Sequence, residues 1–325
     1  MTSTVTRTTH EVSVRGRMQQ VPAFLVDGTV VVVTGSAIQV AEVFDAYWLE
    51  AAKLPDPAHV ARQLAHVSRK PDLFCFTQRA PESRPMFPFH FELENVAAIP
   101  ISTHEEWFQK QISSASRRNI RTSEKKGVTV RVCAFDEAYV RGIMSVSDES
   151  PVRAGRRYWH YGKDFATVEK EQGTYRERAT FLAAYVGDEM VGYLKMVFDT
   201  HTAAIMQIVS KMQFRDRRPN NALLSEAVKQ CVARGVQHLL YERYVYGTKE
   251  DSSLTRFKRE NGFVRIDLPC YYVPLTIKGR LALAAGLHKN VKDRLPQWLT
   301  KHLLAARDKW NARGVAAPEL SNTSA

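Results

Sequence analysis

The sequence predicts an α/β protein whose mixed central sheet is flanked by helices. Between about residues 128 and 275, the patterns follow one another as strand, helix, hairpin, strand, helix, strand, helix, strand. Capping residues mark the expected helix starts, and glycines stand where the helices should end. The chain of 325 residues is 44% apolar and 25% charged, a globular composition that excludes a fibrous or disordered protein. Its length suits two subdomains or one elaborated α/β domain.

The first hundred residues predict short strands and two helices. Asp27-Gly28 lies between two β-prone runs and predicts a hairpin over 24–33. Apolar residues at three- and four-residue steps predict a helix over about 37–51. We further expect a short helix near 58–68 and strands over 72–78 and 89–101, joined by a proline-rich loop at 79–88.

A long basic helix is expected next. Thr103 and Glu106 form a T-x-x-E capping box, and the helix should run to Gly127. The remaining expected elements are a strand at 128–135, a helix capped by Asp136, a hairpin at 181–198, a strand at 203–211, a helix from Pro219 to Gly235, a strand at 238–247, a helix ending at Gly262 and a last strand to about 275. The hairpins at 24–33 and 181–198 are alike, which hints at two related halves.

The chain is basic, because 46 Lys and Arg against 34 Asp and Glu give a net charge of +12. This charge favours anionic partners such as phosphates, nucleic acid or a lipid surface. The sequence has no apolar run of membrane-spanning length and no apolar secretory signal, so we expect a cytoplasmic protein. Its four cysteines lie far apart without a C-x-x-C pair, and no H-E-x-x-H occurs. We therefore expect reduced thiols and no bound metal.

The junction at 211–222 has the strongest anion-binding pattern. Its sequence, KMQFRDRRPNNA, places arginines just before the helix that Pro219 begins. A helix start presents unpaired N–H groups and the positive end of the helix dipole, so the junction predicts a cradle for phosphate or pyrophosphate. The expected donor-binding residues are Lys211, Arg217, Arg218, Asn220, Asn221 and Ala222.

A second candidate site is the loop at 147–165, which is dense in charged and aromatic residues. Loops of this kind on a rigid scaffold often bind substrate, although a merely solvated basic loop is the alternative. The expected substrate-binding residues are Arg153, Tyr158, His160, Tyr161 and Lys163.

The expected strand at 238–247 carries the candidate catalytic residues. Alternation places Glu242, Tyr244 and Tyr246 on one face of this strand. A carboxylate and two phenols on an interior strand are costly unless they have partners, which a catalytic site would supply. Aromatic core packing with hydrogen-bonded hydroxyls is the alternative. Glu149, in the 147–165 loop, is a second candidate carboxylate.

From 128 to 275 the order of elements resembles the GNAT acyltransferase superfamily. In that superfamily a central strand splays from the next, and the cofactor pyrophosphate lies at the following helix start, where the motif is Arg/Gln-x-x-Gly-x-Gly/Ala. This chain has Arg217-x-x-Asn220-x-Ala222, with asparagine in place of the first glycine. The segment FKRENGF at 257–263 is similar to the later helix of the superfamily, which commonly ends in Gly-Phe.

More specifically, EEWFQKQISSASRRNIRTSEKKGVTVRV at 105–132 resembles the segment that joins the two halves of Fem-type peptidoglycan-bridge aminoacyltransferases and their bacterial relatives. There a basic Arg-Asn-x-Arg helix precedes the second GNAT-like unit. The resemblance covers about 95–275. It implies a reduced N-terminal GNAT-like half over 1–101, a GNAT-like acyltransferase domain over 102–276 and a basic amphipathic helical tail over 277–325.

The resemblance implies an acyltransferase that moves an acyl or aminoacyl group to an amine or hydroxyl. This chemistry needs a base for the acceptor, N–H donors for the oxyanion and an acid for the leaving group. Glu149 or Glu242 would be the base, and Tyr244 or Tyr246 the acid. Backbone N–H groups of the strand at 205–211 would bind the oxyanion. The donor would be acyl-CoA or aminoacyl-tRNA, without a metal, and the acceptor a small molecule, a sugar or a cell-wall precursor.

A non-catalytic basic protein is the alternative. The basic helix at 117–126 and the tail at 278–313, which holds nine Lys and Arg against two Asp, would then bind nucleic acid or an anionic membrane. In that case the tail would rest on the inner face of the membrane. No helix-turn-helix, zinc-finger or RNP signature occurs in the sequence, so sequence-specific nucleic-acid binding is not expected.

Overall fold

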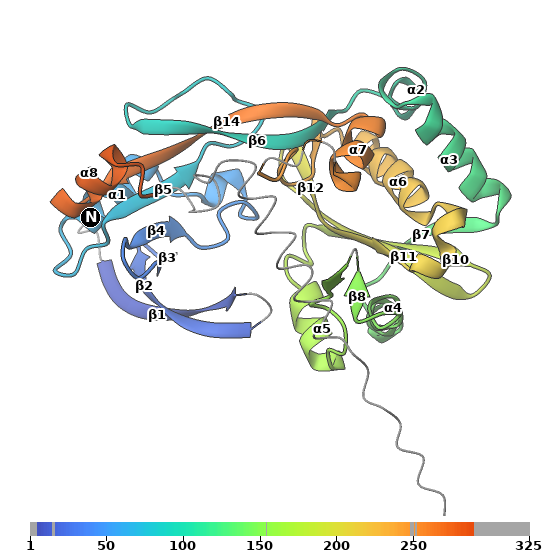
Figure 1. The fold of residues 1–325 in the computed structure, drawn as a ribbon, viewed down its shortest axis with the longest axis horizontal. Helices are drawn as coiled ribbons and strands as arrows, with labels where there is room; N and C mark the ends of the chain where they lie inside the picture. The colour runs from blue at the N-terminus through green and yellow to red at the C-terminus, as the bar shows by residue number, and fades with distance from the viewer. Residues whose placement is uncertain (1–4, 15–16, 154, 248–249, 251, 289–325) are drawn as a thin grey trace, which may run out of the picture.

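The structure of the protein, a computed structural model, describes residues 5–14, 17–153, 155–247, 250 and 252–288. Within these residues the chain forms one twelve-stranded mixed sheet with helices on both faces (Figure 1). From one edge to the other, the strands are β1 (Val5–Val14), β2 (Arg17–Val26), β3 (Thr29–Thr34), β4 (Val40–Val43), β5 (Leu73–Thr77), β14 (Val264–Pro274), β6 (His90–Pro100), β13 (His238–Leu240), β12 (Thr202–Ser210), β11 (Glu189–Phe198), β10 (Ala179–Val186) and β7 (Val128–Cys133). The predicted α/β architecture is confirmed.

The helices begin largely where the capping residues predict. Thr103, Asp136 and Ser252 each accept a hydrogen bond from the backbone N–H three residues further on. The α-helices are α1 (Pro57–Ala65), α2 (His104–Glu106), α3 (Ser114–Lys125), α4 (Glu137–Ser147), α5 (Phe165–Gln172), α6 (Pro219–Ala233), α7 (Ser253–Glu260) and α8 (Ile277–Ala284). The shorter elements are the 3-10 helices η1 (Ala51–Lys53) and η3 (Met212–Arg217), the π-helical turn η2 (Trp107–Gln111), and a separate small hairpin of β8 (Val152–Arg153) and β9 (Arg156–Arg157).

The sheet joins two halves that are built alike. In the C-terminal half the hairpin β10–β11 leads to β12, α6 and the parallel strand β13, whereas in the N-terminal half the hairpin β2–β3 leads to β4, α1 and the parallel strand β5. The next strands are exchanged, because β6 pairs with β13 and β14 pairs with β5. The expectation of two related halves is therefore confirmed. The sheet is continuous across the expected boundary at 101/102, which directly follows β6.

The predicted helix over 37–51 is wrong. This stretch contains β4 and a series of turns. Asp45 has φ 54°, a left-handed conformation that interrupts a right-handed helix. Ala41 and Val43 alternate toward the core as β4 pairs with β3 and β5. The apolar spacing of the stretch suits a strand as well as a helix, and burial against the neighbouring strands decides between them.

The single helix predicted from Thr103 to Gly127 is divided into three parts. The turn η2 ends at Gln111, the next residue is extended, and Ser113 then caps α3 through its side chain. Arg117 donates to three carbonyl oxygens in and just after η2, at distances of 2.7–3.4 Å. These bonds satisfy carbonyl groups that the break leaves without helical partners.

The expected amphipathic tail over 277–325 begins with α8. The residues of the tail from 289 onward lie outside the described residues, and they include most of the basic segment 278–313. No helix within the described ranges combines the length and the apolar character that crossing a membrane requires.

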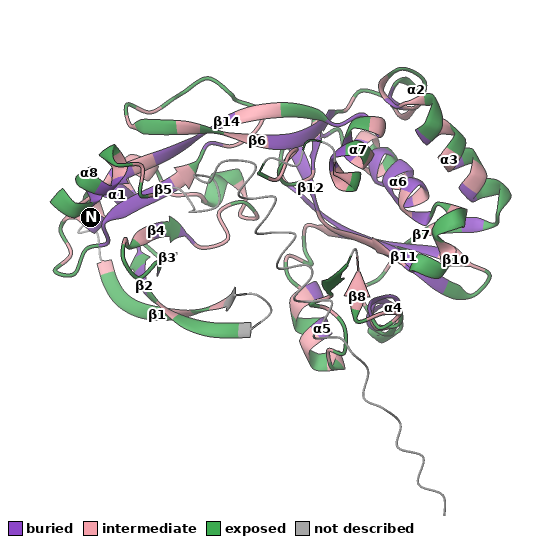
Figure 2. Cartoon of the chain, in the orientation of Figure 1, coloured by how far each residue is buried: buried purple, intermediate pink, exposed green. Residues whose placement is uncertain are grey.

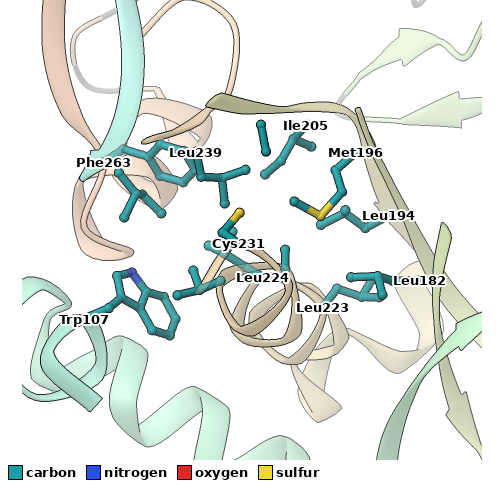
Figure 3. Packing of buried hydrophobic residues seen from close by; sticks show 14 of the residues in the cluster. Trp107, Leu182, Leu194, Met196, Ile205, Leu223, Leu224, Cys231, Leu239 and Phe263 are labelled. Carbon is teal, nitrogen blue, oxygen red and sulfur yellow. The ribbon is translucent and has the colours of Figure 1, made fainter. Parts of the chain in front are cut away.

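The main core lies between α6 and the sheet. Leu223 and Leu224 of α6 pack toward Leu194 of β11, and Trp107 closes the cluster on the side of α3 (Figure 3). Trp107 is fully buried, and its indole N–H donates to the carbonyl of Asn261 at 3.1 Å. On the other face, α4 packs on β11 with α5 beside it. Buried positions concentrate on β10–β12 and α6, whereas β1 is mostly exposed (Figure 2).

Candidate active site

The two parallel strands at the centre of the C-terminal half diverge. β12 and β13 pair only over Thr202–Ala204 and His238–Leu240. β12 then continues to Ser210, whereas the chain after Leu240 turns away. In Figure 1 the limb of β10–β12 and the limb of β6 and β14 open around α6 and α7. Beyond Ala204 this edge of β12 lacks a strand partner among the described residues, so an extended ligand could pair with its backbone groups.

A β-bulge bends β12 at the same point. In the pairing of β11 with β12, Lys195 faces Gln207 and Met196 faces Ile205, which leaves Met206 as the extra residue. Residues 202–205 are buried, but 206–210 are only half-buried. Bulges re-aim a strand and are common beside active sites, so the bulge favours this opening as a site.

The segment after β13 is a turn and not the strand that alternation predicts over 238–247. Glu242 has φ 47°, in the left-handed region, and the β-ladder ends two residues earlier. The three candidate catalytic residues therefore do not share a strand face. Tyr244 packs against the main core, whereas the turn brings the Tyr246 hydroxyl back to donate a hydrogen bond to the Glu242 carboxylate.

A buried lysine holds this turn in place. Lys258 on α7 is fully buried, and its ammonium donates to the carbonyls of Tyr241 (2.8 Å) and Arg243 (2.6 Å). Burial lowers the pKa of Lys258 to about 8, and the negative charge of Glu242 partly offsets this shift by raising the pKa. Burial, together with the hydrogen bond and charge of Glu242, raises the pKa of Tyr246. The turn thus holds a carboxylate beside a phenol that stays protonated at neutral pH.

A cavity of about 900 Å³ lies against this turn and extends into the N-terminal half. Glu242 and Tyr246 contribute to its wall. A large part of the wall comes from β4, the segment after it and β5, where the N-terminal half has its own diverging strands. The parallel pairing there ends at Glu42 and Cys75, and both side chains line the cavity. The cavity therefore joins the opening of the N-terminal half to the turn after β13.

The cavity wall is rich in carboxylates, although the chain as a whole is basic. Burial raises the pKa of Glu42, and the charge of Glu94 adds to that shift. Glu94 also pairs with Arg243 at 2.9 Å. The wall holds four carboxylates against two guanidinium groups, which favours a cationic ligand. These charged residues are Glu42, Asp45, Glu94 and Glu242 against Arg79 and Arg243.

An ion pair between the halves fixes one wall of the cavity. Arg79 donates to Asp199 (2.9 Å) and to the carbonyls of Ala46 (3.0 Å) and Leu49 (2.8 Å). Asp199 also accepts the backbone N–H of Ala51 at 3.1 Å. The segment after β4 is thereby fastened to the end of β11.

The junction at 211–222 lies at the far end of β12, and three of its expected donor-binding residues are engaged within the protein. Lys211 is buried and pairs with Glu189 at 2.7 Å. Arg217 donates to the carbonyl of Lys126 at 2.9 Å, and Asn221 is buried with its amide bonded to another asparagine. These side chains shape the junction and are not free to contact a ligand without rearrangement.

The other residues of the junction are better placed for a ligand. Arg218 is exposed, has φ 58° and directly precedes α6. The side-chain oxygen of Asn220 is buried without a hydrogen-bond partner among the described residues, and Ala222 is half-buried next to it. Pro219 has no N–H, so this cradle offers one backbone donor fewer than a glycine-containing one.

The 147–165 loop supports the end of β12. Arg153 donates to the carbonyl of Ser210 at 2.7 Å. Both oxygens of Glu149 accept backbone N–H groups, from Met212 (2.6 Å) and Gln213 (2.8 Å). Glu149 therefore caps η3 and does not face the cavity, whereas Glu242 does.

The remaining residues of this loop lie together, away from the cavity. The Tyr158 ring lies against the Arg153 guanidinium (4.7 Å), and burial raises the pKa of its hydroxyl. His160 and Lys163 approach the same carboxylate, that of Glu171. Burial and the charge of Lys163 lower the pKa of His160. Tyr161 is exposed, and of the described residues that line the cavity none belongs to this loop.

Sequence reasoning missed several residues of the site. Glu42 lies in the stretch predicted as a helix. Glu94 lies in the strand predicted at 89–101, but the sequence does not show which face of that strand meets the cavity. Lys258 follows Thr255 by three residues on α7, and both are buried. This spacing alone could have placed Lys258 on the inner side of the helix.

Comparison with known proteins gives both a domain and a fold. Residues 110–259 match the acetyltransferase (GNAT) domain family. The fold is similar to that of FemX, with a TM-score of 0.51 and 11% identity over 87% of this chain and 90% of that chain. It is also similar to the C-terminal domain (DUF2156) of a protein assigned as a lysylphosphatidylglycerol synthetase from Agrobacterium fabrum, with a TM-score of 0.53 and 11% identity over 85% and 87% of the two chains. No curated protein matches the sequence.

Proposed function

We propose that the chain is an acyltransferase that moves an acyl group from an acyl-CoA-type donor to an amine acceptor, which its match to the GNAT domain and its FemX-like fold support. The opening between β12 and β13 is the observation that carries this proposal, because Glu242 and Tyr246 follow it in the chain and line a cavity large enough for an acceptor. The donor would approach along β12 and the acceptor through the cavity.

The donor would lie along the free edge of β12. From Ala204 to Ser210 the strand covers about 20 Å at the usual rise per residue, and it ends at the junction at 211–222. N–H groups of 205–210 that point away from β11 would pair with the donor's amides and bind the oxyanion. Arg218 and the start of α6 would contact its phosphates, which is supported by the exposure of Arg218 and by the helix dipole.

The reaction would use the Glu242–Tyr246 pair for proton transfer. The acceptor nitrogen attacks the thioester carbonyl, a C–N bond forms and the C–S bond breaks. Glu242 takes the proton that the nitrogen loses, and Tyr246 protonates the departing sulfur. Glu242 then returns its proton to Tyr246 along their hydrogen bond, so that the products are an amide and a free thiol.

The acceptor would be an amine because the cavity wall is rich in carboxylates. A protonated amine is attracted to Glu42, Glu94 and Glu242, and it gives one proton to solvent before the neutral amine attacks. Burial raises the pKa of Glu42, so a cationic group would stabilise its ionised form. A small molecule, an amino sugar or a cell-wall precursor could each present this group.

Calorimetric titration with CoA and short acyl-CoAs tests the donor. We expect saturable binding that weakens at least tenfold in the Arg218→Ala variant. Arg259→Ala, which removes an exposed arginine of α7, is the matched control and should bind as the wild type does. The acyl-CoA proposal fails if the wild type gives no saturable heat with any of these compounds.

Aminoacyl-tRNA is the second candidate donor, and a basic groove on α3 favours it. Arg118, Arg121 and Lys125 are exposed and lie three and four residues apart, on one side of the helix. The groove of about 410 Å³ is lined by Ser114, Arg117, Arg118, Arg121, Thr122 and Lys125. Binding of tRNA should weaken steeply as the salt concentration rises, because binding releases counterions. In Arg118→Ala/Arg121→Ala the slope of log K against log salt concentration should be smaller, by the equivalent of about two counterions. An unchanged salt slope would exclude this groove.

A further inference from the structure

Three side chains of types that bind metal ions lie close together at the start of β6, away from the turn that carries Glu242. His90 and Glu92 are the first and third residues of β6, so they lie on the same face of that strand. His288 follows α8, and its Nε2 lies 3.0 Å from Oε1 of Glu92. One potential ligand atom from each of the three residues lies within 4.8 Å of the others.

The imidazole of His288 is buried at this cluster. Its side chain is only 2% exposed, and it packs on the Tyr272 ring with centroids 4.5 Å apart. Tyr272 is paired with His90 across β14 and β6. The Nδ1 atom of His288 is buried and has no hydrogen-bond partner among the described residues. The Nε2 atom faces Glu92, so it is the atom of this buried ring that an ion at the cluster would bind.

We propose that His90, Glu92 and His288 bind a divalent transition-metal ion of the zinc type. Two imidazole nitrogens and one carboxylate oxygen suit Zn²⁺, whereas Mg²⁺ and Ca²⁺ prefer sites built from oxygen. Bonds of about 2.0–2.2 Å in tetrahedral geometry separate the ligand atoms by a little over 3 Å, close to the observed contact between Glu92 and His288. The exposed His90 ring can rotate to complete the set.

The ion fastens the end of α8 to the start of β6. His288 also lines the large cavity, so the fourth coordination position is available to water or to a ligand at that wall. The ion stabilises the folded chain because the unfolded chain does not bring residues 90 and 288 together. This inference does not depend on the proposed acyl transfer.

The test is zinc binding by the full-length protein after treatment with chelator and removal of any affinity tag. Calorimetry should show one Zn²⁺ per chain, Zn²⁺ should raise the Tm, and Co²⁺ should give the absorption bands of a four-coordinate site. His288→Ala and His90→Ala should each weaken binding at least tenfold. His201→Ala, which removes an exposed histidine in the turn between β11 and β12, is the control and should not change it.

Two results would overturn the inference. One is a wild-type chain that shows no saturable zinc binding. The other is binding that persists unchanged in His90→Ala, a rim substitution that leaves the buried imidazole in place and so should not disturb folding. Thermal unfolding without metal confirms that each variant is folded before it is titrated.

Discussion

The Tyr246 hydroxyl donates a hydrogen bond to the carboxylate of Glu242, a residue only four positions earlier in the chain. The two meet because Glu242 adopts a left-handed conformation that ends β13 and starts a turn. Non-glycine residues in this conformation cost free energy and cluster at functional sites. In this turn the unusual conformation brings an acid and a base together at the wall of the cavity.

Replacing Glu242 by glutamine should remove the base while keeping the size of the side chain. We expect kcat to fall by about 10²–10⁴-fold, because that is the usual contribution of general base catalysis, with donor affinity unchanged. Steady-state kinetics and calorimetry check the two quantities. Glu137→Gln, on the exposed side of α4, is the matched control. A Glu242→Gln enzyme that retains kcat within threefold would remove this residue from the mechanism.

The contact between the halves should depend on Arg79 and Asp199. Arg79→Met leaves Asp199 largely buried without its cation, so the free energy of unfolding should fall by about 3 kcal/mol. Urea unfolding of Arg79→Met, Asp199→Asn and the double variant measures the coupling. We expect a coupling energy of about 1–3 kcal/mol. Purely additive effects would mean that the two residues act independently.

The buried Lys195 should make stability depend on pH. Burial, and to a lesser degree the Arg176 charge, lower its pKa to about 7 from the usual 10.5. Between these values the unfolded chain binds the proton more often than the folded chain does, so stability should rise with pH above 7. The slope for this group approaches about 1.4 kcal/mol per pH unit.

Comparison with Lys195→Met isolates this contribution. Its removal also deprives the Gln172 carbonyl and the Thr174 hydroxyl of a donor, so the informative quantity is the slope and not the absolute stability. Urea unfolding at pH 7, 8 and 9 should show the variant rising less steeply than the wild type. Parallel curves for the two proteins would indicate that Lys195 keeps an ordinary pKa.

Trp107 should be the most costly truncation in the main core. Its side chain is fully buried, and its indole N–H is bonded to Asn261. Trp107→Ala should lower the free energy of unfolding by about 3–5 kcal/mol through lost burial and a residual cavity. Trp159→Ala is the control, because that ring is 53% exposed and should cost less than about 1 kcal/mol. Equal losses in the two variants would contradict the packing described for Trp107.

The elements with local chemical signals were predictable from the sequence. The hairpin turn at Asp27-Gly28, the caps Thr103 and Asp136, and the start of α6 at Pro219 each depend on residues close in the chain. Where the spacing of apolar residues suits both a helix and a strand, the sequence alone does not decide between them. The stretch at 37–51 is the example, since strand pairing on both sides determines its conformation.

Periodicity and residue chemistry are local properties, so the α/β class, the order of the C-terminal elements and the candidates Glu242 and Tyr246 were all predictable from the amino-acid sequence. The folded chain was needed to show that Glu149 caps η3, that Lys258 is buried under the turn, and that Glu42 and Glu94 face the same cavity as Glu242. The shared cavity depends on the exchange of β6 and β14 between the halves, which brings together residues far apart in the chain. No local pattern encodes such an exchange, since it arises from the burial that the whole sheet achieves.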